Sequence, residues 1–564
     1  MKPILPKLIP TLLALISLNA IAVTRYVDLN SPSPTPPYTS WLTAATNIQD
    51  AIDAASAGDV VLVTNGVYRT SLHIASDGTS NRVAVTRPLT LVSVNGAAVT
   101  TIDGENLLRC VYLTNGAALI GFTLTNGIAV YGGGVWSASL ATVVSNCLMI
   151  SNSAVSFGGG AYAGTLVDSV LRNNQAGNGG GAAANKLNNC TVVGNFSPYG
   201  GGVFAATLTN CTIIDNVAHD GAAGVLTCVL SQCLLSNNIV TGGGGGGGAL
   251  SSSLYQCIIT GNQTTSGGGG GTAGGSVHQC VISNNVAYQG GGTDTSFVNQ
   301  SIVIGNTAWR GGGSYRGSIL NSIIVGNLAF DSGGGTDGGC SLLNSVVYYN
   351  SAPANANYGP ADFFNSSCTT PLPFPPYSPG SFSGKPLFVD MQAGNFQLRS
   401  NSPCINSGSD PVYWPDTNST DYAGQSRKVG GAMDVGAYEY QSPASSLSYA
   451  WAQQYGLPTD GTVDFLDMDG DGANNWQESR ADTIPTNAFS VLKIVSVTND
   501  PSGISVTWQS VDSRKYWLER ATNLNSPSPF QAIYTQFPGS SGMTTLTDNS
   551  AGGTGPYFYR VGGH

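Results

Sequence analysis

Twelve consecutive residues, from Asp467 to Glu478, place oxygen donors at the spacing of a calcium-binding loop. Carboxylates alternate along its first half, Gly472 allows a sharp turn, and a glutamate that can chelate through both oxygens ends it. Hard oxygen donors suit Ca²⁺, and a solvated acidic turn is the alternative. We therefore expect Ca²⁺ as a cofactor, and the predicted ligands are Asp467, Asp469, Asp471, Ala473 through its carbonyl, Asn475 and Glu478.

Acid–base chemistry has few candidates between residues 121 and 350, which contain six Asp, no Glu, one Lys, three Arg and two His. A glycoside hydrolase needs two nearby carboxyl groups, and no Asp-Asp pair is present. A polysaccharide lyase needs a base beside acidic residues. We expect a non-catalytic region, with a carbohydrate-active enzyme as the alternative. The best catalytic candidates fall in successive repeats and are Asp294, Arg310, Arg316 and Asp337.

Aromatic residues recur shortly before runs of glycine. If the repeats stack, these rings could form a strip that binds the faces of sugar rings, and packing of the rings against one another is the alternative. A polysaccharide or a cell-surface glycan is therefore a possible partner. The aromatic residues concerned are Tyr131, Phe157, Tyr199, Tyr288, Trp309 and Phe330.

The elements that carry these residues repeat every 21 to 24 residues. Each unit has a short apolar run after a Cys or Ser, then an Asn, and usually a run of Gly. Such a unit cannot bury its own apolar face, so neighbouring units must stack, about 4.8 Å apart. With 75 Gly in 564 residues and only 9% charged residues, the fold class predicted is all-β: a right-handed parallel β-helix, or solenoid.

Cysteines occupy one equivalent position in six repeats, and Ser takes it in four others. We interpret them as small core residues, because parallel side chains on stacked strands match disulfide geometry poorly. Cys368 and Cys404, outside the repeat, are better candidates for a disulfide. The six cysteines of the ladder are Cys147, Cys190, Cys211, Cys233, Cys257 and Cys280.

The N-terminus indicates export. Lys2 and Lys7 precede an apolar stretch and a small-residue cleavage pattern, which together predict a signal peptide over 1–22. No later stretch is long and apolar enough for a transmembrane segment, so we expect a secreted or cell-surface protein. The net charge of −10 argues against nucleic acid as a partner, and the oligomeric state stays open.

The composition and pattern change along the chain and predict six segments. A helix with Ile48, Ala51 and Ile52 on one face should cap the solenoid, after a capping box that begins at Thr46. Asp434 and Glu439 are expected in a hydrogen-bonded closing coil. The segments are a signal peptide (1–22), a cap with the first coils (23–120), β-helix repeats (121–383), a closing module (384–445), a calcium linker (446–487) and a small β-sandwich (488–564).

Short motifs resemble those of known β-helix families. Residues 50–68 resemble the first coil of pectate-lyase-like β-helix proteins, a fold that hosts polysaccharide lyases and hydrolases. Gly132 to Trp136 and Gly158 to Tyr162 resemble repeats of chlamydial-type polymorphic outer membrane proteins, which implies adhesion or surface display. Two hypotheses therefore stand: a non-catalytic adhesin or glycan-binding surface protein, and a carbohydrate-active enzyme.

The C-terminal part resembles three further modules. Residues 384–440, with SPCINSG at Ser402 to Gly408, look like the choice-of-anchor-type module of bacterial surface β-helices. Residues 451–487 resemble the calcium-loop linkers of dockerin-like and thrombospondin type 3 proteins. The alternating strands after residue 488 resemble a fibronectin type III module. These resemblances imply a surface location, calcium binding and a spacer or carbohydrate contact.

Overall fold

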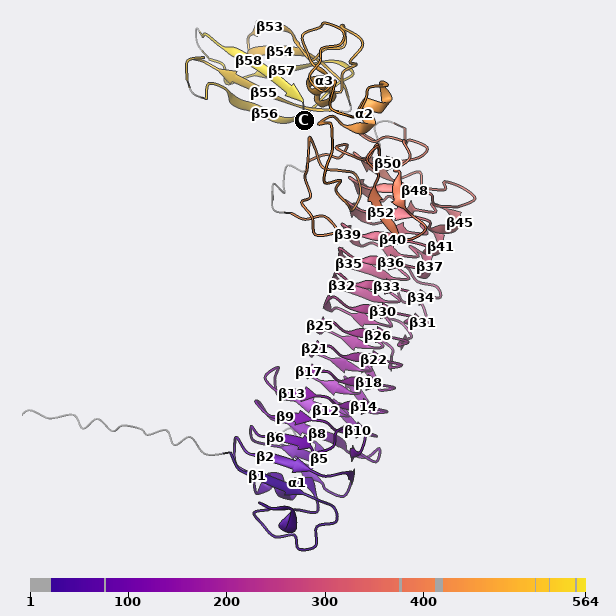
Figure 1. Ribbon diagram of the computed structural model, residues 1–564, viewed down its shortest axis with the longest axis vertical. Coiled ribbons are helices and arrows are strands. Elements are labelled where there is room, and N and C mark those ends of the chain that lie inside the picture. The colour runs from indigo at the N-terminus through magenta and orange to yellow at the C-terminus, as the bar shows by residue number, and fades with distance from the viewer. Residues whose placement is uncertain are drawn as a thin grey trace, which may run out of the picture.

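The computed structural model describes residues 22–75, 78–374, 378–410, 419–512, 514–526, 528–552 and 555–563. Nearly all of the predicted signal peptide lies outside these residues. The described chain forms a long rod of parallel strands, with small antiparallel sheets at its C-terminal end (Figure 1). This arrangement confirms the predicted all-β solenoid.

One column of the rod is a parallel ladder of 14 strands in the described residues. The middle residue of a strand points into the rod: Leu171, Val192 and Ile213 are in register and fully buried. The strands are β3 (Gly66–Tyr68), β7 (Thr100–Asp103), β10 (Thr123–Thr125), β14 (Leu148–Ile150), β18 (Val170–Arg172), β22 (Thr191–Val193), β26 (Thr212–Ile214), β30 (Leu234–Ser236), β33 (Ile258–Thr260), β36 (Val281–Ser283), β40 (Ile302–Ile304), β44 (Ile323–Val325), β48 (Val346–Tyr348) and β50 (Cys368–Thr369).

A second column follows the first around each coil and contains ten described strands. It carries the aromatic residues of interest. The strands are β11 (Ile128–Tyr131), β15 (Ser153–Phe157), β19 (Gln175–Asn178), β23 (Phe196–Ser197), β27 (Val217–Ala218), β31 (Ile239–Val240), β34 (Gln263–Thr264), β37 (Val286–Gln289), β41 (Thr307–Arg310) and β45 (Leu328–Ser332).

The remaining rod strands form one sheet of 26 described strands, which makes up the other two columns of the coil. The two columns merge in the long strands β32 and β35. The strands are β1 (Thr24–Val27), β2 (Val60–Val63), β4 (His73–Ile74), β5 (Ser80–Val85), β6 (Thr90–Ser93), β8 (Arg109–Leu113), β9 (Ala118–Ile120), β12 (Val135–Ser137), β13 (Val143–Ser145), β16 (Ala161–Tyr162), β17 (Thr165–Val167), β20 (Ala182–Ala183), β21 (Lys186–Asn188), β24 (Val203–Phe204), β25 (Thr207–Thr209), β28 (Val225–Leu226), β29 (Val229–Ser231), β32 (Ala249–Tyr255), β35 (Thr272–His278), β38 (Thr293–Asp294), β39 (Phe297–Asn299), β42 (Ser314–Tyr315), β43 (Ser318–Leu320), β46 (Thr336–Asp337), β47 (Ser341–Leu343) and β49 (Phe363–Asn365).

Buried asparagines stack inside the rod at the turn between the first two columns. The Oδ1 atom of Asn238 accepts hydrogen bonds from the backbone N–H and from Nδ2 of Asn216, at 3.1 and 2.9 Å. Its own Nδ2 donates to the carbonyl of Ile213 and to Oδ1 of Asn262. The same pattern joins each coil to the next, so the side-chain amide of each asparagine hydrogen-bonds polar groups in the turn of the preceding coil. The ladder comprises Asn152, Asn174, Asn195, Asn216, Asn238, Asn262, Asn285, Asn306, Asn327 and Asn350.

The glycine runs allow neighbouring turns to approach closely. A Cβ atom on Gly181 would lie 2.8 Å from the carbonyl oxygen of Gly202 and 2.9 Å from a methyl of Val192. A second stack, of cysteines, runs along another turn of the coil. The N–H of Cys190 donates to Sγ of Cys211 at 3.4 Å, and this contact repeats up to Cys280. All 11 cysteines are buried free thiols.

The N-terminal end of the rod is covered by α1 (Ile48–Asp53), preceded by a 3₁₀ turn, η1 (Trp41–Thr43). Ile48, Ala51 and Ile52 are buried in the rod core, as predicted. The helix begins one residue later than expected. The N-cap is Asn47, whose side chain accepts a hydrogen bond from the backbone N–H of Asp50. This bond closes the first turn in place of the capping box predicted from Thr46.

Residues 384–440 do not form another coil, which corrects the predicted closing coil. After the antiparallel pair β51 (Phe388–Asp390) and β52 (Asn395–Leu398), the described part of this segment is irregular. It packs against apolar side chains such as Ile323 and Val346 on the outer face of the first column. Apolar side chains also occupy the outer face of earlier coils, and in the last coils this segment covers them, so it buries surface that would otherwise meet water.

Polar contacts order the same segment and fix it to the rod, where Arg427 Nη2 donates to Oδ1 of Asn321 at 3.2 Å. Arg427 is buried and pairs with Glu439 at 3.5 Å, and Oδ1 of Asp434 accepts from the N–H of Asn406. Burial raises the pKa of Glu439. The Cys368 thiol, in the last strand of the first column, contacts the Cys404 thiol; the predicted disulfide partners are therefore neighbours but unbonded.

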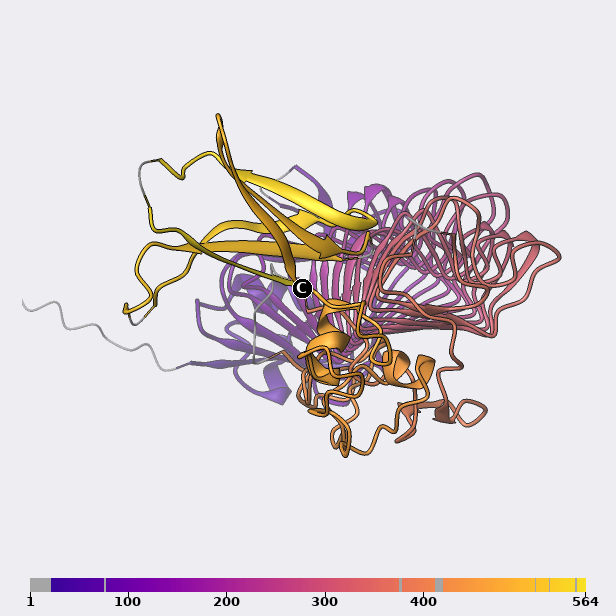
Figure 2. The ribbon, with the colours of Figure 1, turned by 90° about the horizontal axis from the view of Figure 1, so that it is seen from above.

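Two short helices and two small sheets complete the described chain. The helices are α2 (Tyr449–Gln454) and α3 (Asn475–Ala481). One three-stranded antiparallel sheet has the order β53 (Ile494–Asp500), β54 (Gly503–Ser510) and β57 (Gly542–Asp548), and the other has β56 (Gln531–Pro538), β55 (Lys515–Ala521) and β58 (Phe558–Gly563). The sheets pack on Trp508, Tyr516 and Leu518 and project to one side of the rod (Figure 2). No helix among the described residues has the length and apolarity to cross a membrane.

Candidate functional site

Three aromatic side chains project from one face of the rod on consecutive coils. Tyr288, Trp309 and Phe330 lie in β37, β41 and β45, each after an alanine that is in register with the alanines of the neighbouring coils. A bulge then sets Phe330 and Asp331 together opposite Trp309. The residue before each ring is a buried alanine, so the alternation of the strand turns the ring outward. The rings are 51%, 46% and 57% exposed. They offer flat apolar surface to solvent at a regular spacing.

A groove of about 310 Å³ runs over these rings. The coil before Tyr288 supplies polar groups to it from β34 and the residue that follows. Thr265 Oγ1 donates to the carbonyls of Thr241 and Gly242. The backbone N–H of Gln263 donates to the carbonyl of Asn238, and its exposed side-chain amide makes no hydrogen bond within the described residues. The groove therefore combines apolar ring surface with a few polar side-chain groups that could orient a ligand. It is lined by Gln263, Thr264, Thr265, Val286, Ala287, Tyr288, Trp309 and Phe330.

The other three predicted aromatic residues are arranged differently. Tyr131 and Phe157 stack with ring centroids 5.9 Å apart and planes 6° apart, and both contact Tyr162. Tyr199 lies over the backbone of Gly221. The coils between Tyr199 and Tyr288 carry His219, Thr241 and Thr265 three residues after the ladder asparagine, so the six predicted residues do not form one continuous strip.

The four catalytic candidates come together as two ion pairs. Arg310 pairs with Asp337 at 3.0 Å, and Arg316 pairs with Asp294 at 3.1 Å. In the ladder of β38, β42 and β46, Tyr315 lies between Asp294 on one neighbouring strand and Asp337 on the other. Burial raises the pKa of Asp294, and the hydrogen bonds from Arg316 oppose that rise. Each acid already has a cationic partner, so this geometry provides no unengaged acid–base pair.

The predicted metal loop is folded as a tight turn. Asp467, Asp469 and Asp471 bring carboxylate oxygens within 4.8 Å of one another. Backbone N–H groups of Gly470 and Gly472 donate to Asp467, at 2.8 and 2.9 Å, and hold its carboxylate in place. The Ala473 N–H donates to Asp471. The loop therefore gathers three like charges without a cationic side chain in the group.

Two further predicted ligands lie buried at the beginning of α3. Asn475 and Glu478 are fully buried, and within the described part of the chain their Oδ1 and Oε2 atoms have no hydrogen-bond partner, like one oxygen each of Asp469 and Asp471. Asn475 Nδ2 donates to the carbonyl of Val463, which fixes the direction of its Oδ1. Burial, followed by the charges of the neighbouring aspartates, raises the pKa of Glu478 to about 7. An all-oxygen set with unsatisfied buried acceptors fits a hard divalent cation.

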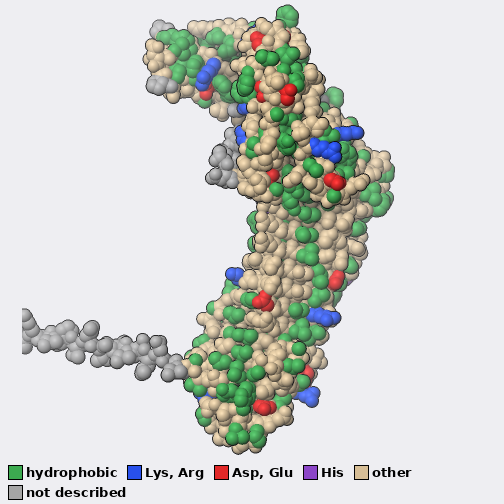
Figure 3. Space-filling view, viewed as in Figure 1, with side chains coloured by type: hydrophobic (Ala, Val, Ile, Leu, Met, Phe, Trp, Pro, Cys, Tyr) green, Lys and Arg blue, Asp and Glu red, His purple; other side chains and the backbone are tan. Residues whose placement is uncertain are grey.

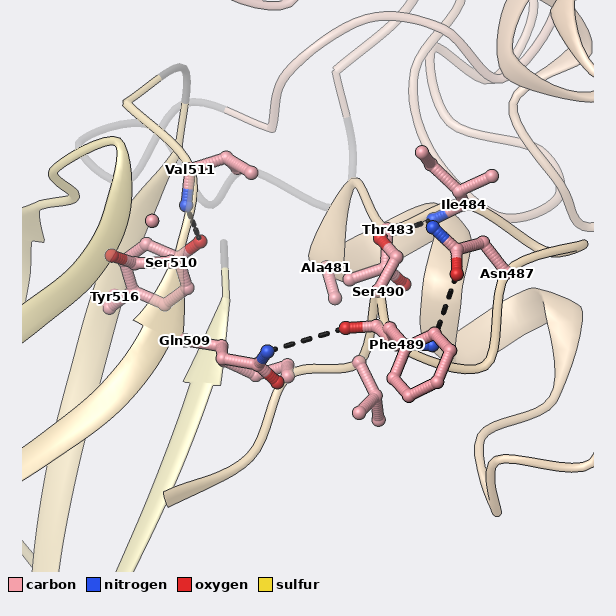
Figure 4. A pocket seen from close by; sticks show the side chains of 13 residues that line it. Ala481, Thr483, Ile484, Asn487, Phe489, Ser490, Gln509, Ser510, Val511 and Tyr516 are labelled. Carbon is pink, nitrogen blue, oxygen red and sulfur yellow. Dashed lines mark hydrogen bonds between the residues drawn. The ribbon is translucent and has the colours of Figure 1, made fainter. Parts of the chain in front are cut away.

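A second cavity, of about 270 Å³, lies between the linker that follows α3 and the sandwich (Figure 4). Gln509 Nε2 donates to the carbonyl of Phe489 across it, and the Tyr516 hydroxyl accepts from the N–H of Val511. From the sandwich, Arg514 Nη2 donates to the carbonyl of Ser479 in α3. These bonds join linker to sandwich, so the cavity marks a junction between elements.

Sequence reasoning missed Gln263, Thr264 and Thr265, although their position carries a signal. Tyr288 and Trp309 each follow a ladder asparagine by three residues, as does Thr265. Counting from the buried asparagine therefore gives the register of a residue on this face. The same count separates the three groove aromatics from Tyr199 and the two N-terminal rings, which stand at other distances.

Residues 90–264 match a family model described as "Right handed beta helix region". The rod is a right-handed parallel β-helix. Its fold resembles those of pectate lyase Pel9A (15% identity, 74% of this chain and 97% of that chain, TM-score 0.28) and of the PL6 family polysaccharide lyase Pedsa3628 from Pseudopedobacter saltans (11%, 70% and 96%, 0.28). It also resembles the mannuronan C-5 epimerase AlgE6 A-module from Azotobacter vinelandii (15%, 58% and 96%, 0.26). Similarity this distant carries no information on the ligand of this chain. No curated protein matches it.

Proposed function

We propose that this chain is an exported, non-catalytic β-helix that binds a polysaccharide along the groove over Tyr288, Trp309 and Phe330. The observation that carries the proposal is that three exposed rings on consecutive coils line one groove. Stacked strands lie about 4.8 Å apart, close to the advance per sugar unit in an extended glycan. Each coil can therefore present one ring face to one sugar.

The charged cluster supports binding without catalysis. Arg310 and Arg316 are each within 3.1 Å of a buried carboxylate. A general base must reach the substrate with a free lone pair, and both carboxylates are engaged by a guanidinium. A carbohydrate-active enzyme remains the alternative, and release of unsaturated uronates from acidic polysaccharides by the purified protein would support it.

Replacing the central ring tests the binding site. Trp309→Ala removes the largest of the three ring faces, and we expect at least a tenfold loss of glycan affinity in titration calorimetry. Phe157→Ala is the matched control, because its ring packs against Tyr131 on the same column but outside the groove. Equal losses in both variants, or none in either, would contradict the proposed site.

We further propose that the loop from Asp467 to Glu478 binds Ca²⁺. The supporting observation is the pair of fully buried ligands, Asn475 and Glu478, whose free oxygens lie in an otherwise acidic turn. A bound cation would satisfy these acceptors and relieve the repulsion between the carboxylates. The ion would be structural, since the loop lies in the linker and not beside the groove.

A further inference from the structure

We propose that the groove selects a neutral glycan, at least three sugar units long, and rejects polyuronates. This inference rests on the proposed function, because it names the chemistry of the ligand at the same site. The proposal depends on the charge of the groove and its rim, because the ring faces alone would accept acidic and neutral sugars alike.

The groove itself carries no formal charge. Its walls are ring faces, a valine and an alanine, and the hydroxyl and amide groups of Thr264, Thr265 and Gln263. Amides and hydroxyls hydrogen-bond sugar hydroxyl groups without compensating an anionic ligand. Few charged side chains interrupt the middle of the rod on the face shown in Figure 3. A carboxylate brought into this groove would lose hydration without gaining a counter-charge.

The cation nearest in sequence to the rings is already neutralised. Arg310 follows Trp309, but it pairs with Asp337 at 3.0 Å and lies 3.7 Å from Asp331. Asp331 follows Phe330, and its side chain is 51% exposed, so it places negative charge at the rim. A polyuronate would therefore meet repulsion at the rim and no free guanidinium inside.

The register sets the direction and the minimum length of the ligand. The three rings follow one another along the stack of coils, so the glycan lies along the rod axis. Each ring accounts for one sugar, and affinity should rise steeply up to a trisaccharide and then level off. A ligand lying across the coils would reach only one ring.

The wild-type full-length protein should first be probed on an array of neutral and uronate-containing glycans, with affinities then measured at low and high salt. We expect binding to neutral glycans, insensitive to salt, and at least tenfold weaker in Trp309→Ala. Binding confined to polyuronates, weakened by salt and lost in Trp309→Ala, would overturn the inference while leaving glycan binding at the groove intact. Failure to bind either class would overturn both.

A charge reversal at the rim gives an independent test. Asp331→Lys should gain salt-sensitive binding to polygalacturonate, at least fivefold above wild type, and keep its affinity for the neutral ligand within about twofold. Asp220→Lys, an exposed acid on a distant coil, is the matched control and should gain none. An Asp331→Lys protein that binds polygalacturonate no better than the control would show that rim charge does not decide the ligand.

Discussion

At the scale of single residues, the asparagine ladder is the most specific feature of the rod. Asn, Gly and Cys or Ser recur at fixed places, and each place has a separate physical reason. The amide of Asn238 satisfies donors and acceptors on both neighbouring coils. Gly181 leaves room for the next turn. The cysteine position requires a small buried side chain.

Removing one rung of this ladder should be costly. Asn238→Ala leaves two donors of Asn216 and the carbonyl of Ile213 without their partners inside the rod. We expect a loss of about 2–4 kcal/mol in the free energy of unfolding, measured by urea denaturation followed by circular dichroism. Thr209→Ala, on an exposed strand position, should change stability by less than about 0.5 kcal/mol. Equal effects would argue against a structural role for the ladder.

At the scale of elements, prediction succeeded where the pattern repeats and failed where it does not. The coil length and the apolar face of α1 follow from periodicity. Residues 384–440 have no period, and nothing in their sequence shows that they pack beside Ile323 and Val346. The groove was predicted only in part, because its polar wall comes from a coil that lacks an aromatic residue. The spacing of residues 467–478 predicts candidate Ca²⁺ ligands, and Ca²⁺ binding there stays a prediction. The burial of Asn475 and Glu478 depends on the packing of α3.

The loop should bind Ca²⁺ through Glu478 more than through any other single side chain. Glu478→Gln removes a buried charge that can chelate through both oxygens, so we expect loss of the calcium-dependent rise in melting temperature in calorimetry of the full chain. At millimolar Ca²⁺ the stabilisation of the wild type should be about 1–3 kcal/mol for a site of modest affinity. Asp460→Asn, an exposed nearby acid outside the loop, is the control. A Glu478→Gln protein that keeps the full calcium response would rule out the proposed ligand set.

At the scale of the whole molecule, each coil touches mainly the coils before and after it. Stability is therefore close to a sum over coils and their interfaces. The helix α1 covers one end, and the segment after residue 384 covers the outer face of the last coils (Figures 1 and 2). Hydrogen bonds from Gln279 to the carbonyl of Asp421, and from Asn344 to that of Ser409, tie this segment across several coils.

These ties determine how the rod responds to a pulling force. The hydrogen bonds between coils run along the rod axis, so tension between the ends stretches them lengthwise and peels coils off singly. The segment beside the coils from 279 to 344 holds these coils together through its hydrogen bonds. The N-terminal coils lack this support and should therefore unfold first. Each released coil of 21–24 residues frees about 70–80 Å of chain, which single-molecule extension would record as evenly spaced steps. The rod would then lengthen gradually under load while the coils that carry Tyr288, Trp309 and Phe330 keep their shape.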